Sequence, residues 1–382
     1  MNEYKNYKNN MVEQVKSLPS LMRQQYQDLE AKTRNVMTTP EIFSIQEIVL
    51  TGCGDSYGAA LGTKYAFEGL TGLPVRVVPA VELSRYYPEK QIGYAPYNPL
   101  VIAVSNSGSP ARVGEAAKRV VKRGGFVLGI TGNPDSLLGS SSSRVLKLDI
   151  PAFPSSPGVR SYMVSVLALL LLAIRFGEVR GRYTMDEAMR YRTDICSHSH
   201  EIEGALEGLD KQMLDLALRW RHMEAFDFIG SGPDYAAAFY GHAKVYEAIG
   251  KYAMCVNTEE WLHLNFFMKQ IDKIGTILIS SSGDQAKSRL REVLECAVKK
   301  MKRPTVFITD SEAEAEASGT ESVVLPAPKY TYTAALTKFI PSALLMGYLA
   351  QILGEEYGRG CKGSWSFAQN GNGLSQSEII VK

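Results

Sequence analysis

The chain has 382 residues, of which 45% are hydrophobic and 21% charged, so it is long enough for two folded domains and is neither disordered nor fibrous. Its 42 Lys and Arg nearly balance its 40 Asp and Glu. The chain therefore lacks the excess of positive charge that is typical of proteins that bind nucleic acid or an anionic membrane. The longest apolar run, residues 163–174, is too short for a bilayer span of about 20 residues, and we expect it to form a buried helix.

The N-terminal residues and the cysteines indicate a reduced, cytoplasmic protein. The first ten residues, MNEYKNYKNN, contain no hydrophobic core, so we expect no signal peptide. None of the five cysteines belongs to a CxxC pair or to a Cys/His cluster, the patterns that zinc sites and disulfide frameworks show. The sequence therefore predicts a protein with no metal and no cofactor.

The first predicted elements are helical. Residues 10–36 carry apolar side chains at helical spacing, and Pro19 interrupts the pattern. Because proline disrupts the interior of a helix, we predict two short helices in this stretch.

The strongest organisational signal is an internal repeat. Four strand-like landmarks of the first half recur in the second half, in the same order and at nearly constant spacing, and the first of them carries the similar motifs GCGDSYGAA and GSGPDYAAA. Such self-similarity predicts two copies of one domain. The matching segments are 48–60 with 228–238, 101–108 with 276–283, 126–131 with 304–309, and 145–151 with 321–326.

Within each copy, short β-rich runs alternate with helical patterns. In the first copy, for example, an amphipathic pattern from Val113 to Val121 ends at Gly124. Strands that alternate with helices predict a parallel sheet covered on both faces, and right-handed crossovers make such a sheet doubly wound. We therefore predict an α/β protein of two tandem doubly wound domains. The predicted order is an N-terminal helical segment (1–45), a first domain (46–195), a second domain (196–350) and a C-terminal tail (351–382).

Two turns of the first copy are suited to hold a phosphate group. TGCGDS (51–56) and SNSGS (105–109) each follow a predicted strand, and ligands of parallel α/β sheets lie at the carboxyl ends of strands. Glycines let successive N–H groups point inward, and the following helix adds a partial positive charge. A third turn, SSPGVRS (155–161), can close such a pocket. The side chains that supply further donors are those of Ser56, Ser105, Asn106, Ser107, Arg160 and Ser161.

Each Gly/Ser-rich turn is also compatible with a purely structural role. A dinucleotide fingerprint requires a third glycine at position 57, where Tyr57 stands, and no Walker sequence is present. In the second copy, Pro233 removes a donor and SSSGDQ (280–285) places an acid where a phosphate would approach. We interpret the second copy as the degenerate partner, which supplies chemistry rather than an anchor.

Taken together, these residues resemble the sugar-isomerase (SIS) superfamily, in the tandem arrangement of the isomerase half of glucosamine-6-phosphate synthase. The resemblance covers roughly residues 10–350 and implies flavodoxin-like, three-layer domains. It is carried by GCGDSYGAA (52–60), SNSG (105–108), GVRS (158–161), GSGPDYAAA (230–238) and AKVYEAIGKYAMCVNTEEWLH (243–263).

The resemblance implies a substrate-binding set in the first copy. The family's phosphate loop falls on Ser105, Asn106 and Ser107. Its Thr-Ser pair falls on Asp55 and Ser56, and Asp55, which departs from the usual threonine, is suited to a sugar hydroxyl. Ser161 lies in the GVRS motif.

The resemblance also implies a catalytic set in the second copy, made of Lys244, Glu247 and His263, with the histidine sixteen residues after the glutamate as in the family. A carboxylate suits a proton shift between C1 and C2 of a hexose, and an imidazole suits ring opening near neutral pH. Lys244 is expected on the same helical face as Glu247. Without the resemblance, Glu247 and His263 are compatible with structural roles. In the related synthase the histidine comes from the other subunit, so a homodimer with shared sites is implied.

One departure restricts the reaction. The synthase forms an imine through a lysine in a Leu-Ala-Lys-Ser stretch, and the counterpart here is LSQS (374–377), with Gln376 in place of that lysine. An amide cannot form this imine. The resemblance then favours a deglycase or deaminase that cleaves the C–N bond of a fructosamine 6-phosphate or amino-sugar 6-phosphate. The alternatives are a ketose/aldose phosphosugar isomerase and a non-catalytic sugar-phosphate sensor.

Overall fold

The structure is a computed structural model that describes residues 7–357 and 372–381. Residues 1–6 of the predicted N-terminal segment and residues 358–371 and 382 of the predicted tail lie outside the described residues. The chain divides into two compact units, which we call the first-copy unit and the second-copy unit. Among the described residues, the first-copy unit comprises Leu21–Ala152, Arg160–Cys196 and 372–381, and the second-copy unit comprises 7–20, Phe153–Val159 and Ser197–Tyr357.

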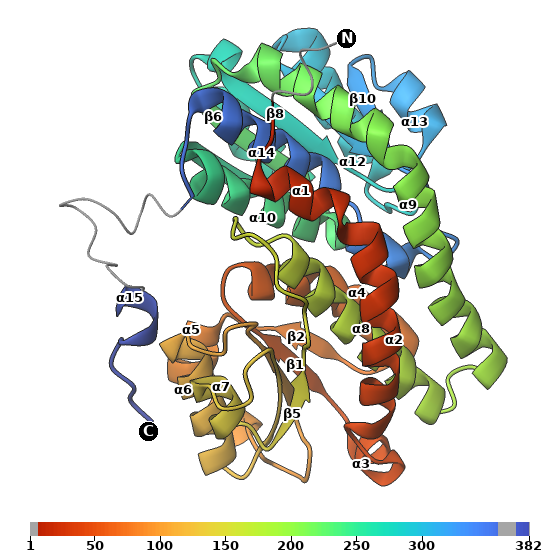
Figure 1. The fold of residues 1–382 in the computed structure, drawn as a ribbon, viewed down its shortest axis with the longest axis vertical. Helices are drawn as coiled ribbons and strands as arrows, with labels where there is room; N and C mark the ends of the chain where they lie inside the picture. The colour runs from red at the N-terminus through yellow and green to blue at the C-terminus, as the bar shows by residue number, and fades with distance from the viewer. Residues whose placement is uncertain (1–6, 358–371, 382) are drawn as a thin grey trace. The chain divides into compact units, whose positions relative to one another are not determined.

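The first-copy unit is built on a five-stranded parallel sheet with the order β2-β1-β3-β4-β5. Helices α5, α6 and α7 cover one face, and α4 and α8 cover the other (Figure 1). The strands are β1 (Ile48–Thr51), β2 (Val75–Val77), β3 (Leu100–Val104), β4 (Phe126–Thr131) and β5 (Arg144–Lys147). The helices are α2 (Leu18–Asn35), α3 (Thr39–Ser44), α4 (Asp55–Thr71), α5 (Ala80–Arg85), α6 (Ala111–Lys122), α7 (Leu137–Ser141), α8 (Arg160–Val179), the start of α9 (Met185–Trp220) and α15 (Asn372–Ser375).

The second-copy unit has a parallel sheet of the order β10-β9-β8-β6-β7. Its strands are β6 (Ala225–Gly230), β7 (Tyr252–Val256), β8 (Ile274–Ile279), β9 (Thr305–Thr309) and β10 (Glu321–Val324). Its helices are α1 (Asn10–Lys16), the end of α9, α10 (Tyr235–Lys244), α11 (Thr258–Leu264), α12 (Lys287–Leu294), α13 (Glu312–Ala317) and α14 (Ile340–Leu353), with π-helical turns at Val245–Ile249 and Glu295–Lys300.

The two sheets share one topology. Read from its other edge, the second sheet has the order β7-β6-β8-β9-β10, which repeats the order of the first sheet strand for strand. This is the flavodoxin-like order, with a switch point between the first and third strands of each sheet. The predicted α/β fold of two tandem doubly wound halves is confirmed. The strands β2 and β7, each beside the first strand of its sheet, were not predicted.

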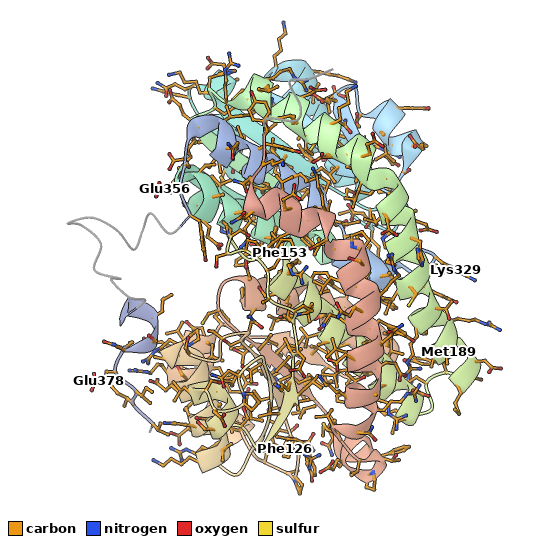
Figure 2. All side chains as sticks on the ribbon, viewed as in Figure 1. Phe126, Phe153, Met189, Lys329, Glu356 and Glu378 are labelled. Atoms are coloured by element: carbon orange, nitrogen blue, oxygen red, sulfur yellow. The ribbon has the colours of Figure 1, made fainter. Side chains whose placement is uncertain are left out.

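The apolar runs of the sequence form strands and helices that are buried on all sides. Every residue of β3 and of β8 is buried, because helices cover both faces of each sheet. The run 163–174 lies in α8 and is buried, as predicted. Two segments, Arg160–Val179 and Thr331–Leu353, are long and apolar enough to cross a membrane, yet 83% of the apolar window of each is buried inside the protein, as in core helices. In the first-copy unit α8 packs mainly on α4, and side chains fill the space around the sheet (Figure 2).

The N-terminal helices differ from the prediction in length. A break does occur near Pro19, because α1 ends at Lys16 and α2 begins at Leu18. Pro19 is the second residue of α2, where a missing N–H costs no helical hydrogen bond. The second helix has 18 residues and is therefore not short.

The turn after β3 requires a glycine. Gly108 has a φ of 65°, and its N–H donates to the carbonyl oxygen and the Oγ of Ser105, each at 3.1 Å. A Cβ added at Gly108 would lie 1.9 Å from the Oγ of Ser136. The left-handed backbone and the close neighbour therefore both exclude a side chain at this position.

We expect Gly108→Ala to lower the free energy of unfolding by about 3 kcal/mol. The left-handed conformation accounts for about 1–2 kcal/mol, and the clash with Ser136 accounts for about 1–3 kcal/mol. The matched control is Gly124→Ala, because Gly124 has a φ of 78° but no atom within 4 Å of an added Cβ. Urea denaturation followed by circular dichroism measures both variants, and equal losses would contradict the role of Ser136.

Candidate functional site

The first predicted phosphate turn lies between β1 and α4. Gly54 precedes α4 with a φ of 53°, and a Cβ at Gly52 would lie 2.8 Å from the backbone carbon of Ser56. Both glycines are therefore needed for the chain to reverse direction at the end of β1. Asp55 and Ser56 follow as the first two residues of the 17-residue α4, half-buried at the positive end of its dipole.

The second predicted phosphate turn lies between β3 and α6. Ser105 is buried, and its Oγ accepts the Gly108 N–H, so its hydroxyl shapes the loop. Asn106 and Ser107 are exposed. The carbonyl oxygen of Asn106 accepts a hydrogen bond from the Gly132 N–H at 2.9 Å. The backbone of Asn106 is therefore anchored while its side chain faces solvent. The loop thus offers an exposed amide and hydroxyl beside the N-terminus of α6.

These two turns meet at one edge of the sheet. Strands β1 and β3 are neighbours, with Leu50 opposite Ile102 and Thr51 opposite Ala103, and their helices α4 and α6 lie on opposite faces (Figure 1). The turns therefore occupy the switch point of the first sheet, where ligands of open α/β sheets bind.

The third turn contributes the start of α8. Ser161 is half-buried in its first turn. Arg160 is buried and donates to the Pro151 carbonyl at 3.2 Å, which gives this guanidinium a structural task. Tyr162, which was not predicted as a site residue, is buried, and burial together with the nearby charge of Asp55 raises the pKa of its hydroxyl. The structure therefore brings the start of α8 close to the start of α4.

The corresponding turns of the second copy are closed by an internal carboxylate. Asp234 occupies the position that Ser56 has in the first copy. It is buried, and its Oδ2 accepts hydrogen bonds from both the N–H and the Oγ of Ser281, each at 2.8 Å. The Nζ of Lys338, also buried, lies 2.6 Å from Oδ1. The donors that would hold an anion thus hold Asp234, which explains the degenerate character predicted from the sequence.

The acid that the sequence analysis pointed to, Asp284, has a different task. Its Oδ2 accepts from the Oγ of Ser280 at 2.8 Å, and its Oδ1 accepts from the N–H of Ala286 at 2.7 Å. It shapes the turn before α12 rather than facing the anion position directly.

Lys244 and Glu247 form a close pair in the second-copy unit. Helix α10 ends at Lys244 and continues as the π-helical turn Val245–Ile249, which Gly250 terminates in a left-handed conformation. The Nζ of Lys244 is fully buried and lies 2.8 Å from the Oε2 of Glu247, whose side chain is 37% exposed. π-Turns occur often at functional sites. This one carries the carboxylate of Glu247, which Lys244 holds in place and which is partly exposed to solvent.

Tyr240 links this pair to the loop before α8. The Nζ of Lys244 lies 4.9 Å from the centroid of the Tyr240 ring, and the Tyr240 hydroxyl donates to the Gly158 carbonyl at 2.9 Å. Gly158 is the first residue of the GVRS motif. Tyr240 was not predicted, because nothing in the local pattern indicates a partner 82 residues away.

His263 lies on α11, in a separate cluster of charged side chains. Its side chain is 64% exposed, and its Nε2 lies 3.0 Å from the Oε1 of Glu259. Arg289 donates to the same carboxylate at 2.8 Å and, with help from His263, holds the pKa of Glu259 below its ordinary value. Glu259, which the sequence analysis interpreted as a supporting residue, orients the imidazole. The structure thus pairs Glu247 with Lys244 and His263 with Glu259.

Helix α11 is fixed by a buried charge. Asp227 on β6 accepts from the Trp261 Nε1 at 3.2 Å, from Asn265 at 3.2 Å and from Arg303 at 2.7 Å. Because Trp261 and Asn265 lie on either side of His263, this carboxylate holds both ends of the segment that carries the imidazole.

Part of the chain matches the model of a known family. Residues 41–175 match the model of the SIS domain family. Among curated relatives, the glutamine–fructose-6-phosphate aminotransferase (isomerizing) of Gloeobacter violaceus is 26% identical over 251 residues, 64% of this chain and 40% of that protein. The enzyme of the same name from Zymomonas mobilis is 24% identical over 365 residues, 93% of this chain and 58% of that protein. The chain thus spans about half the length of these relatives.

Solved structures share the fold over nearly the whole chain. The C-terminal domain of glucosamine-fructose-6-phosphate aminotransferase from Francisella tularensis has a TM-score of 0.78 at 18% identity and covers 92% of this chain and 98% of its own. A glucosamine-6-phosphate deaminase from Thermotoga maritima has a TM-score of 0.62 at 19% identity, with coverages of 90% and 96%. A tagatose-6-phosphate ketose/aldose isomerase from Escherichia coli has a TM-score of 0.68 at 16% identity, with coverages of 91% and 96%. The resemblance inferred from the sequence is confirmed, since residues 41–175 match the SIS domain family and the solved structures share the fold.

Proposed function

We propose that this chain is a cytoplasmic enzyme that cleaves the C–N bond of a fructosamine 6-phosphate or an amino-sugar 6-phosphate, releasing an amine and a hexose 6-phosphate. The observation that carries the proposal is the pair of a fully buried Lys244 and a half-exposed Glu247 in a π-turn. The relatives support the substrate class, since the names of the aminotransferase, the deaminase and the isomerase all refer to hexose 6-phosphates.

In this proposal the first-copy unit binds the phosphate group. The N-termini of α4 and α6 supply backbone N–H groups and partial positive charge. The exposed side chains of Asn106 and Ser107 and the half-buried side chains of Ser56 and Ser161 supply further donors. Asp55 accepts a hydrogen bond from a sugar hydroxyl. These neutral donors suit a phosphate monoester, and no arginine is required.

Glu247 then carries a proton between C1 and C2 of the open-chain sugar. With a fructosamine 6-phosphate, it removes a proton from C1 and returns it to C2, which converts the 1-amino ketose into an imine at C1. Water adds to that imine, and the C–N bond breaks to give the aldose 6-phosphate and the free amine. The short bond from Lys244 holds the carboxylate in a fixed orientation through both transfers.

His263 serves ring opening and the departure of the amine in this scheme. An imidazole exchanges protons near neutral pH, and its contact with Glu259 fixes the ring orientation. No lysine imine is needed, because the substrate already contains the C–N bond. Ketose/aldose isomerisation uses the same proton shift without the cleavage step, and it is the alternative that the structural likeness to the isomerase keeps open.

We further propose that the enzyme is a homodimer in which His263 completes the site of the other subunit. An exposed His263 is followed directly by a run of exposed apolar side chains, whose exposed fractions range from 45% to 73%. Such a run marks an interaction surface. A second copy that covers it also removes the neighbouring imidazole from water. The apolar residues are Leu264, Phe266, Phe267 and Met268.

We expect Glu247→Gln to lower the rate of amine release from a fructosamine 6-phosphate at least 100-fold with little change in substrate affinity, because general acid–base catalysis contributes about 10²–10⁴-fold. The matched control is Glu295→Gln, since Glu295 also lies in a π-turn and also faces a lysine, Lys299, at 3.7 Å. Released amine and hexose 6-phosphate are both assayed. Interconversion of aldose and ketose without amine release would instead establish the isomerase, and binding without turnover would establish a sensor.

We expect His263→Ala to be inactive alone and to recover activity when mixed with Glu247→Gln. If sites are shared, each mixed dimer contains one intact site, and a statistical mixture regains about a quarter of the wild-type rate. His200→Ala is the control, because His200 is similarly exposed and also faces a glutamate, at 3.6 Å. Light scattering reports the oligomeric state, and a dimer whose mixture stays inactive would contradict sharing.

We expect one phosphosugar to bind per chain, because Asp234 fills the anion position of the second copy. Ser107→Ala should weaken binding of glucosamine 6-phosphate about tenfold or more, the loss of one hydrogen bond to a charged group. Ser282→Ala, at the equivalent position of the second copy, should leave the affinity unchanged. Titration calorimetry gives both values, and a stoichiometry of two would contradict the closure by Asp234.

A further inference from the structure

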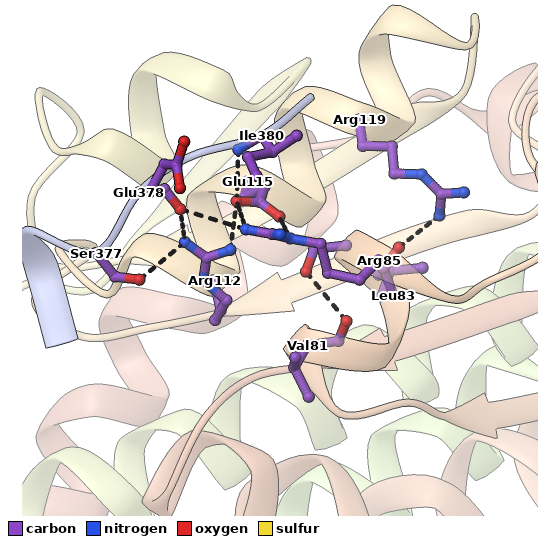
Figure 3. Close-up of polar contacts among 10 residues, drawn as sticks. Val81, Leu83, Arg85, Arg112, Glu115, Arg119, Ser377, Glu378 and Ile380 are labelled. Carbon is purple, nitrogen blue, oxygen red and sulfur yellow. Dashed lines mark hydrogen bonds and ion pairs between the residues drawn. The ribbon is translucent and has the colours of Figure 1, made fainter. Parts of the chain in front are cut away.

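The C-terminal segment lies along helix α6 of the first-copy unit. Helix α15 packs against α6, and the residues after it follow α6 toward its C-terminal end (Figure 3). Ser377 contacts Arg112 in the first turn, Ile380 contacts Glu115 one turn later, and Val381 contacts Lys122 at the last residue of the helix. The direction and register of the segment are therefore both defined.

Most of these contacts involve the main chain of the segment. Arg112 and Arg85 both donate to the carbonyl oxygen of Glu378, the latter at 3.3 Å. The Oε2 of Glu115 accepts the N–H of Ile380 at 2.9 Å, and Lys122 donates to the Val381 carbonyl at 3.2 Å. The side chain of Glu378 is exposed at the surface (Figure 2). Recognition thus falls on the backbone, as when an extended peptide adds to a sheet edge.

The groups that make these contacts are tied to one another and to helix α5. The Glu115 side chain is fully buried and forms ion pairs with Arg85 and Arg112. Arg119 on the same helix donates to the Leu83 carbonyl at 2.8 Å and the Tyr87 carbonyl at 2.7 Å, which ties α6 to α5. A buried carboxylate is stable only when its oxygens are satisfied, and the Ile380 N–H completes the set around Glu115.

We propose that Arg85, Arg112 and Glu115, which we call the α5–α6 clamp, form a recognition site for the main chain of an extended peptide, and that its occupant is the C-terminal segment of this chain. The chemistry is the same whether the segment comes from the same chain or from a second copy. Two guanidinium groups bind one carbonyl, and one carboxylate binds the N–H two residues later. A peptide with free N–H and carbonyl groups at this spacing fits, whatever its side chains.

The clamp also determines where the preceding residues lie. Ser377 contacts Arg112 in the first turn of α6, helix α15 just before it packs against α6, and the loop Ser105–Gly108 precedes that turn in the sequence. This step rests on the proposed function, in which that loop binds phosphate. The clamp then holds Gln376 and its neighbours at the mouth of the phosphate site, and it contributes to substrate affinity without touching the reacting carbons.

The test removes one main-chain donor from the full-length protein. Ile380→Pro deletes the N–H that Glu115 accepts, whereas Ile380→Val retains it with a similar side chain. Amide hydrogen exchange measured by mass spectrometry on residues 374–381 should be at least tenfold slower in the wild type and in Ile380→Val than in Ile380→Pro. Glu378→Ala should match the wild type. Equal exchange in all four proteins would overturn the clamp.

A mixture identifies the source of the segment. Arg112→Leu has an intact segment and a damaged clamp, and Ile380→Pro has the reverse. In the mixture, the intact segment of the Arg112→Leu chain can reach an intact clamp only on an Ile380→Pro chain. Slow amide exchange of that segment after mixing would therefore show that the segment docks onto a second copy. Exchange that stays fast would show that it docks onto its own chain. Both results support the clamp, provided that each variant exchanges fast alone. Slow exchange in Arg112→Leu alone would count against it.

Activity measurements distinguish a failure of the proposed function from a failure of the α5–α6 clamp. With an active wild type, Ile380→Pro should raise KM for the phosphosugar at least fivefold and leave kcat within twofold. If the wild type releases no amine but exchange follows the clamp, the proposed function fails and the clamp stands. If the wild type is active and Ile380→Pro changes neither KM nor exchange, the clamp fails and the proposed function stands.

Discussion

A buried ammonium group governs the arrangement around Glu247. Lys244 is fully enclosed, and a charge in that position is tolerated only with a partner close by. The partner is Glu247, and the ring of Tyr240 lies against the same nitrogen. The position of the carboxylate is thus determined by a desolvated charge within the unit, before any substrate is present. A carboxylate held this way needs little reorganisation to exchange protons with a ligand.

The two copies use the same sheet topology for opposite purposes. At one equivalent position the first copy has the hydroxyl of Ser56 and the second has the carboxylate of Asp234. The serine leaves the surrounding donors available, whereas Asp234 binds Ser281 and Lys338 and closes the turn. Under the proposed function, this one substitution of a donor by an acceptor separates the turn that receives a phosphate group from a turn that supplies its own anion. In the same proposal, the second copy carries the acid–base groups on its helices.

The sequence was informative where a signal is local. The repeat predicted the buried central strands because they are continuous apolar runs. The family resemblance pointed to Glu247 and His263, whose catalytic roles stay a prediction. The short edge strand β2 (Val75–Val77) has no such run and was missed. Contacts between distant segments were also missed, since no local pattern relates Tyr240 to Gly158, Asp234 to Lys338 or Glu115 to Ile380. The π-turn was missed as well, because its residues fit an ordinary helix equally well.

The π-turn at Val245–Ile249 has a consequence for how this helix tolerates change in length. An α-helix advances about 100° per residue, and a π-turn accommodates one additional residue without shifting what precedes it. A deletion there would restore regular winding and leave the packing of α10 intact. Removal of Val245 or Tyr246 would, however, leave the glutamate only two residues after the lysine, a spacing at which the two side chains do not face each other. The spacing between Lys244 and Glu247 is therefore under a stricter constraint than the hydrophobic packing around it.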